Sequence, residues 1–162
     1  MRQEARADKD IVLAAVRGYG SLLQYASKEL QGTKEVALEA VRQNSWALKH
    51  ASKAMRGDRD VVLAAVRHYG PVLKYASEAL RGTKEVVLAA VALDPHCLAY
   101  AAESVRGDCD VVLAAVNRTG GALRWASEDL KASRDVVLAA VRGDAHALEW
   151  AAEALRADPD VW

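Results

Sequence analysis

The chain repeats itself every 25 residues, and this period constrains its fold more than any other feature. Rows that start at Asp8, Thr33, Asp58, Thr83, Asp108 and Ser133 align without a gap. Five columns of this alignment never change, and their first members are Leu13, Ala15, Val16, Leu23 and Ala26. A fixed period of this length is typical of a repeat protein, in which each unit buries its apolar face against its neighbours.

Each row predicts two short helices, because its apolar residues recur at spacings of three and four. In the third row the first helix places Val62, Leu63, Ala65 and Val66 on one face. The second helix of that row places Leu73, Ala76, Ser77 and Leu80 on one stripe. The invariant alanines let neighbouring helices approach closely. The sequence therefore predicts an all-α fold, an α-solenoid of six two-helix repeats.

The ends of the helices are marked by their residue types. The first column is Asp, Thr or Ser, which predicts a side-chain cap on the first helix of every row. The turn before the second helix alternates between two forms, which gives a 50-residue superperiod. Odd rows place a glycine there, whereas even rows place Asn44, Asp94 and Asp144 as predicted N-caps. Pro71 and Pro95 suit the first helical positions that follow.

The same register predicts the domain organisation. We expect one solenoid over residues 8–157, preceded by an N-terminal extension, 1–7, and followed by the start of a truncated seventh repeat, 158–162. The six predicted repeats are 8–32, 33–57, 58–82, 83–107, 108–132 and 133–157. The sixth row keeps its full apolar set, so we expect Trp162 or another molecule to cover it.

One stretch carries a resemblance to a known family. Residues 61–82 read Val-Val-Leu-Ala-Ala-Val, a glycine turn, and then Leu-Lys-Tyr-Ala-Ser-Glu-Ala-Leu-Arg-Gly. This motif resembles a 25-residue repeat family known only as a domain of unknown function, which occurs in arrays in algae, protists, bacteria and large viruses. The resemblance covers nearly the whole chain and implies helical repeats. It brings no catalytic residues, and Glu39 and His50 depart from its pattern.

Composition and charge limit the classes of function. No apolar run approaches the ~20 residues of a membrane-spanning helix, and the amino terminus lacks the apolar core of a secretory signal. We therefore expect a soluble, intracellular protein. Lys plus Arg and Asp plus Glu number 22 each. Residues 1–82 hold 14 basic and 9 acidic residues and residues 83–162 hold 8 and 13, so the halves carry net charges of +5 and −5. Opposite ends of opposite charge favour head-to-tail self-association or a larger assembly.

No set of residues predicts catalysis, a cofactor or a metal. His96 and His146 share a column but lie two repeats apart, too far to share a metal ion. His96 has no partnered nucleophile. Cys97 stands in a column of small apolar residues and is expected to act as one of them. Cys109 replaces a Lys or Arg at a first helical position, which leaves a redox-sensing role open as a third, least favoured function.

Two further features have structural explanations. One aromatic column runs through the second helices, as Tyr25, His50, Tyr75, Tyr100, Trp125 and Trp150. Its rings can stack on a ligand, but packing against the neighbouring repeat is the favoured interpretation. Lys74 with Glu78 and Arg124 with Glu128 are spaced as salt bridges on one helix face.

The turn within each repeat varies while its surroundings stay constant. Variable positions on one edge of a repeat array commonly serve recognition, although drift in exposed loops explains them equally well. We name this edge the turn edge. Its candidate partner-binding residues are Arg17, Tyr19, Arg42, Trp46, Arg67, Tyr69 and His96. The leading hypothesis is a non-enzymatic protein-binding or scaffold module, and single-stranded RNA binding is the alternative, disfavoured by the neutral net charge.

Overall fold

The computed structural model describes residues 4–158, and all regular structure in that range is helical. The predicted all-α repeat solenoid is therefore confirmed. The chain divides into two compact units, residues 1–80 and 81–162, whose boundary lies inside a short helix. Residues 159–162, which include Trp162 and most of the predicted seventh repeat, lie outside the described residues.

Every repeat has a long α-helix, a six-residue 3₁₀ helix and a one-turn α-helix. In the first unit these are α1 (Lys9–Gly18), η1 (Gly20–Tyr25), α2 (Lys28–Gln31), α3 (Lys34–Gln43), η2 (Ser45–His50), α4 (Lys53–Arg56), α5 (Arg59–Val66), η3 (Gly70–Tyr75) and α6 (Glu78–Arg81). In the second they are α7 (Lys84–Val91), η4 (Pro95–Tyr100), α8 (Glu103–Arg106), α9 (Cys109–Val116), η5 (Gly120–Trp125), α10 (Glu128–Lys131), α11 (Arg134–Gly143), η6 (Ala145–Trp150) and α12 (Glu153–Arg156).

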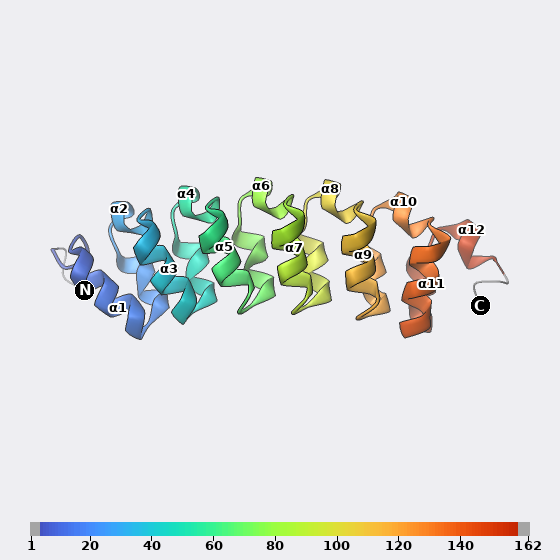
Figure 1. The fold of residues 1–162 in the computed structure, drawn as a ribbon, viewed down its shortest axis with the longest axis horizontal. Helices are drawn as coiled ribbons and strands as arrows, with labels where there is room; N and C mark the ends of the chain where they lie inside the picture. Colours follow the sequence, from blue (N-terminus) through green and yellow to red (C-terminus); the bar gives the residue numbers. More distant parts are fainter. Residues whose placement is uncertain (1–3, 159–162) are drawn as a thin grey trace. The chain divides into compact units, whose positions relative to one another are not determined.

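Within each unit the repeats stack in register. Helices α1, α3 and α5 lie side by side in the first unit, and α7, α9 and α11 do so in the second (Figure 1). The 3₁₀ helices form a second row in each unit, η1 to η3 and η4 to η6. The core lies between the two rows, where Leu23, Leu48, Leu98 and Leu123 are fully buried.

The structure divides the predicted second helix in two. Ala26 and Ser27 are extended, with φ and ψ of −65° and 157° and of −60° and 157°. Ser27 then accepts the Leu30 N–H as the N-cap of α2. The freed backbone bonds to the neighbouring repeat, as the N–H of Ser52 donates to the Gln31 carbonyl at 3.0 Å. The break therefore exchanges bonds within a helix for a bond between repeats.

The predicted caps are confirmed at most positions. Asp8, Asp58 and Asp108 each accept two backbone N–H groups at the start of a long helix. Asn44, Asp94 and Asp144 cap the 3₁₀ helices of the even repeats. The prediction is wrong at Thr33, Thr83 and Ser133, whose side chains make no capping hydrogen bond to the long helices that follow them. The Thr33 hydroxyl donates instead to the Glu29 carbonyl of the preceding short helix.

Candidate functional site

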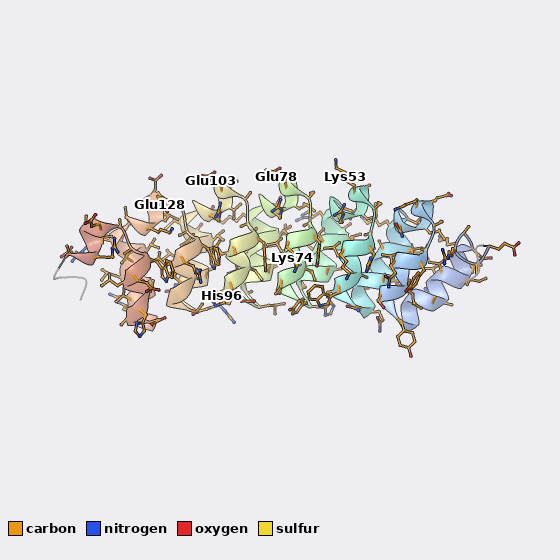
Figure 2. All side chains as sticks on the ribbon, turned by 180° about the vertical axis from the view of Figure 1, so that it is seen from behind. Lys53, Lys74, Glu78, His96, Glu103 and Glu128 are labelled. Carbon is orange, nitrogen blue, oxygen red and sulfur yellow. The ribbon has the colours of Figure 1, made fainter. Side chains whose placement is uncertain are left out.

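The turn edge is built by the end of each long helix and the start of the 3₁₀ helix that follows. In the second unit Figure 2 shows His96, on this edge, at the opposite side from Glu103 on short helix α8. Tyr19 and Tyr69 occupy the same extended position, and their side chains are 71% and 42% exposed. Trp46 lies two positions later in its own repeat, as the second residue of η2, and is 38% exposed. These are among the most exposed large apolar side chains of the first unit.

Trp46 and Tyr69 come together from consecutive repeats. Their ring centroids are 5.4 Å apart with planes inclined at 34°. The Trp46 ring also meets Tyr75 edge-on, at 6.0 Å. Aromatic pairs in this range contribute roughly 0.5–1.5 kcal/mol beyond their burial. The backbone N–H of Trp46 donates to Asn44 Oδ1 at 3.0 Å, which caps the 3₁₀ helix that carries Trp46.

Lys74 completes this cluster. Its Nζ lies 5.2 Å from the Trp46 ring centroid and 5.1 Å from that of Tyr75. A cation above aromatic faces is attracted by their quadrupoles. Sequence reasoning placed Lys74 in a salt bridge with Glu78 and so missed this contact. Trp46, Tyr69, Lys74 and Tyr75 are called the aromatic cluster below.

The arginines of the turn edge lie along the long helices. Arg17 Nε is 2.9 Å from a Glu39 carboxylate oxygen, and Arg42 lies 3.5 Å from the other. Arg42 and Arg67 border a shallow hollow of about 350 Å³. Its remaining lining residues are Leu38, Asp60, Leu63 and Ala64. Glu39, a departure from the usual alanine of its column, thus positions two of the candidate residues.

The other candidate residues stand apart from the aromatic cluster. In the described part of the chain no ring contact or ion pair joins Tyr19 to it. His96 belongs to the second unit, where it is exposed and its backbone N–H donates to Asp94 Oδ1 at 2.9 Å. The structure therefore brings together Trp46 and Tyr69 among the predicted residues, with Arg42 and Arg67 around a separate hollow.

The aromatic column supports the structural interpretation. In the second unit the Arg124 guanidinium lies 4.6 Å from the Trp125 ring centroid and 4.8 Å from that of Trp150. The cation occupies the space in which a flat ligand would stack. The predicted bridge from Arg124 to Glu128 is wrong, because the extended residues Ala126 and Ser127 separate the two helices that hold them. Glu128 instead pairs with Lys131, at 2.8 Å.

The cysteines lie in two different environments. Cys97 is fully buried, and burial first, with Asp94 second, raises the pKa of its thiol to about 12. It is held as the neutral, apolar thiol that its column predicts. Cys109 is exposed at the start of α9. Between residues 4 and 158 no three His, Cys, Asp or Glu side chains gather as metal ligands.

One charged pattern escaped the sequence analysis. The lysine at the second position of a repeat pairs with acids of the next repeat. Lys9 pairs with Glu35 at 2.6 Å, and Lys34 with Asp58 and Asp60 at 3.0 and 2.6 Å. Lys84 pairs with Asp108 and Asp110 in the same way. Both columns are visible in the sequence, but the pairing joins residues 24 to 26 apart and needs the stacking to be known.

These features define a helical-repeat protein with constant stacking faces and a variable, partly aromatic edge. The family model described as Domain of unknown function (DUF4116) matches residues 8–56, 58–106 and 108–156, and the chain belongs to this family. Each match spans two 25-residue repeats, in agreement with the 50-residue superperiod. No curated protein and no solved structure matches the chain. In the part of the chain that the structure describes, no helix has the length and apolar character to span a bilayer.

Proposed function

We propose that this protein is a non-enzymatic module that binds a protein partner through the turn edge of its first unit, as a scaffold or a subunit of a larger complex. The observation that supports this proposal most is the aromatic pair Trp46 and Tyr69, whose rings contact each other across two repeats and yet remain 38% and 42% exposed. Burying apolar rings stabilises a folded chain, and these two rings stay partly exposed and so available to a binding partner.

The chemistry of this surface fits a protein interface. Binding energy at protein interfaces concentrates in Trp, Tyr and Arg side chains surrounded by less important contacts. Trp46 and Tyr69 supply the rings, and Arg42 and Arg67 supply guanidinium groups on the adjoining long helices. Because the Trp46 ring already contacts Tyr69 and Tyr75, part of the side-chain entropy of these rings is lost before binding.

The proposal that the protein is not an enzyme is supported by where its titratable groups lie. The carboxylates with lowered pKa values are Glu35, Asp58 and Asp108, and each is paired with a lysine on the surface. General acid–base and covalent catalysis use a nucleophile with an adjacent base, whereas these three carboxylates are engaged in ion pairs between repeats.

The test is partner capture by the full chain carrying Trp46→Ala and Tyr69→Ala. We expect at least a tenfold loss of the captured protein, because hot-spot residues carry about 2 kcal/mol each. The matched control is Tyr25→Ala, since Tyr25 is a 46% exposed aromatic residue of the same unit outside the turn edge. Equal capture by the double variant and the control would remove the turn edge from the proposal.

The alternative function is binding of single-stranded RNA. The net charge of +5 over residues 1–82 and the exposed rings favour it, because such proteins combine basic grooves with stacking platforms. A gel-shift titration at rising salt separates the two proposals. Phosphate contacts weaken steeply with salt, whereas capture through aromatic rings does not.

A further inference from the structure

A second surface of the first unit differs from the turn edge in chemistry and position. A pocket of about 520 Å³ lies between the first and second repeats, where η1 and α2 face η2 and α4. Its lining residues are Gln24, Lys28, Gln31, Lys49, His50, Ala51, Ser52, Lys53 and Arg56. The pocket is therefore formed by the short helices and the 3₁₀ ends, away from Trp46 and Tyr69.

The charged side chains that line this pocket are all cationic. It carries three lysines and one arginine, and no carboxylate. Elsewhere in the same unit the lysines of the long helices pair with acids of the next repeat, as Lys34 does with Asp60. By contrast, no ion pair within residues 4–158 engages Lys28, Lys49 or Lys53. Four like charges around one hollow repel each other unless an anion joins them.

Arg56 and His50 add two observations to the positive charge of this pocket. Arg56 Nε is buried and has no hydrogen-bond partner. Buried polar groups are nearly always bonded, so this donor calls for an acceptor. Burial first, and the adjacent Lys49 second, lower the pKa of His50. An anion in the pocket would offer an acceptor to Arg56 Nε, and its negative charge would raise the pKa of His50.

Comparison with the other repeats shows that this positive charge is particular to the first and second repeats. The column of Lys28 and Lys53 holds glutamate in the other four repeats, as Glu78, Glu103, Glu128 and Glu153. Figure 2 shows Lys53 and Glu78 projecting from the short helices of the first unit. One repeat further on, a smaller pocket of about 230 Å³ contains Lys53, Arg56 and Glu78. The orphaned Nε recurs at Arg81 and Arg106, so the lysines, not the arginine alone, distinguish the first pocket.

We propose that this pocket binds the terminal phosphate of a small phosphorylated molecule. Four cations suit an oxyanion with two or more charges better than a single carboxylate. The arginine offers donors in a planar fork, and the lysines supply mobile point charges. A volume of about 520 Å³ accommodates a phosphate together with an attached organic group. Gln31 fixes one wall, because its Nε2 donates to the carbonyl of Ala26 at 3.1 Å.

The experiment titrates the full chain with inorganic phosphate and pyrophosphate at low chloride and follows backbone amide shifts by NMR. We expect saturable shifts confined to residues 24–56, with pyrophosphate the tighter ligand. The pKa of His50, followed through its ring protons, should rise when pyrophosphate is bound. Absence of saturable shifts in the wild-type chain would overturn the proposal.

The decisive variant is Lys28→Glu with Lys53→Glu, which installs the residue that four other repeats carry in this column. It should weaken pyrophosphate binding at least tenfold and leave the helical circular dichroism unchanged. If the charge reversal lowers the stability of the fold, the neutral double variant Lys28→Gln with Lys53→Gln replaces it. The matched control is Arg118→Glu with Arg142→Glu, two exposed residues of the second unit that change the net charge equally.

Three further outcomes would decide against the site. Equal loss of binding in the control would show that net charge alone attracts the anion. Undiminished binding in both lysine variants would place the anion elsewhere. An oligoribonucleotide without terminal phosphates that competes as well as pyrophosphate would replace the proposal with RNA backbone binding. Retained pyrophosphate binding in the Trp46 and Tyr69 double variant is expected, because this site does not rest on the turn edge.

Discussion

Lys34 on α3 reaches Asp60 on α5, in the next repeat, with 2.6 Å between Nζ and Oδ2. The relationship recurs 50 residues later, where Lys84 Nζ lies 2.5 Å from Asp110 Oδ2. These pairs connect successive repeats along the N-terminal ends of the long helices. Repeat proteins gain stability from each interface between neighbours, so a pair that joins two repeats acts on that interface directly.

Lys84→Gln should destabilise the second unit at neutral pH and have little effect in acid. Lys84 holds the pKa of Asp108 below its ordinary value of 3.8 by hydrogen bonding. A lowered pKa in the folded state stabilises the fold above about pH 4, and this contribution is lost as the pH falls through the lowered pKa. Urea unfolding of wild type and variant at pH 7 and pH 3 measures the difference. If Lys84→Gln lowered the free energy of unfolding as much at pH 3 as at pH 7, the pairing of Lys84 with Asp108 would be contradicted.

Cys109→Lys should stabilise the protein. Cys109 occupies the position from which lysines pair with the next repeat, and Asp135 stands 26 residues further on, as Asp60 does from Lys34. A new pair of this exposed kind contributes about 0.5 kcal/mol at low salt. Thermal unfolding with and without 0.5 M salt, with Cys109→Ala as the control, measures it. No gain over alanine, or a gain that salt leaves intact, would count against a stabilising role for these pairs between repeats.

Gly120→Ala should destabilise the protein, whereas Gly121→Ala should not. A Cβ on Gly120 would overlap the backbone carbonyl of Ala140 in the next repeat and lie 3.0 Å from Asp144 Cβ. A backbone group cannot rotate away, so overpacking of about 1–3 kcal/mol is expected. A Cβ on Gly121 would meet nothing within 4 Å. Chemical denaturation of the two single variants provides the comparison, and equal stabilities would show that the repeats are less closely stacked there.

Head-to-tail self-association, proposed from the charge of the two halves, should depend on salt. Residues 1–82 carry +5 and residues 83–162 carry −5, and added salt screens such an attraction. Light scattering on a sizing column should give a mass above 17.5 kDa at low salt and that of the monomer at high salt. A mass of 17.5 kDa at every salt concentration would remove self-association from the account.

The sequence was most informative about burial and least about the course of the backbone. The invariant column that begins at Leu23 is buried throughout, because a leucine every 25 residues has one consistent place in a stack. The break after each 3₁₀ helix was missed, since Ala26 and Ser27 continue the helical spacing. The available signal was the serine itself, a strong N-cap residue in the middle of an expected helix.

The candidate site was only partly predictable for a related reason. Trp46 and Tyr69 occupy different columns and lie 23 residues apart, so no comparison of columns pairs their rings. Lys74 was assigned to Glu78 on the assumption of one continuous helix. The division between η3 and α6 separates that pair and leaves Lys74 above Trp46 and Tyr75. Contacts between residues of the same column can be predicted from the 25-residue period. Contacts between residues of different columns can be predicted only when the course of the backbone is known.

The proposed partner should bind at the turn edge of the first unit, and photo-crosslinking in the source cell tests this most directly. Benzoylphenylalanine at position 69 should form a covalent adduct with one specific protein. The same group at position 25, on an equally exposed ring of the same unit, should not. Adducts from position 25 with none from position 69 would contradict the claim.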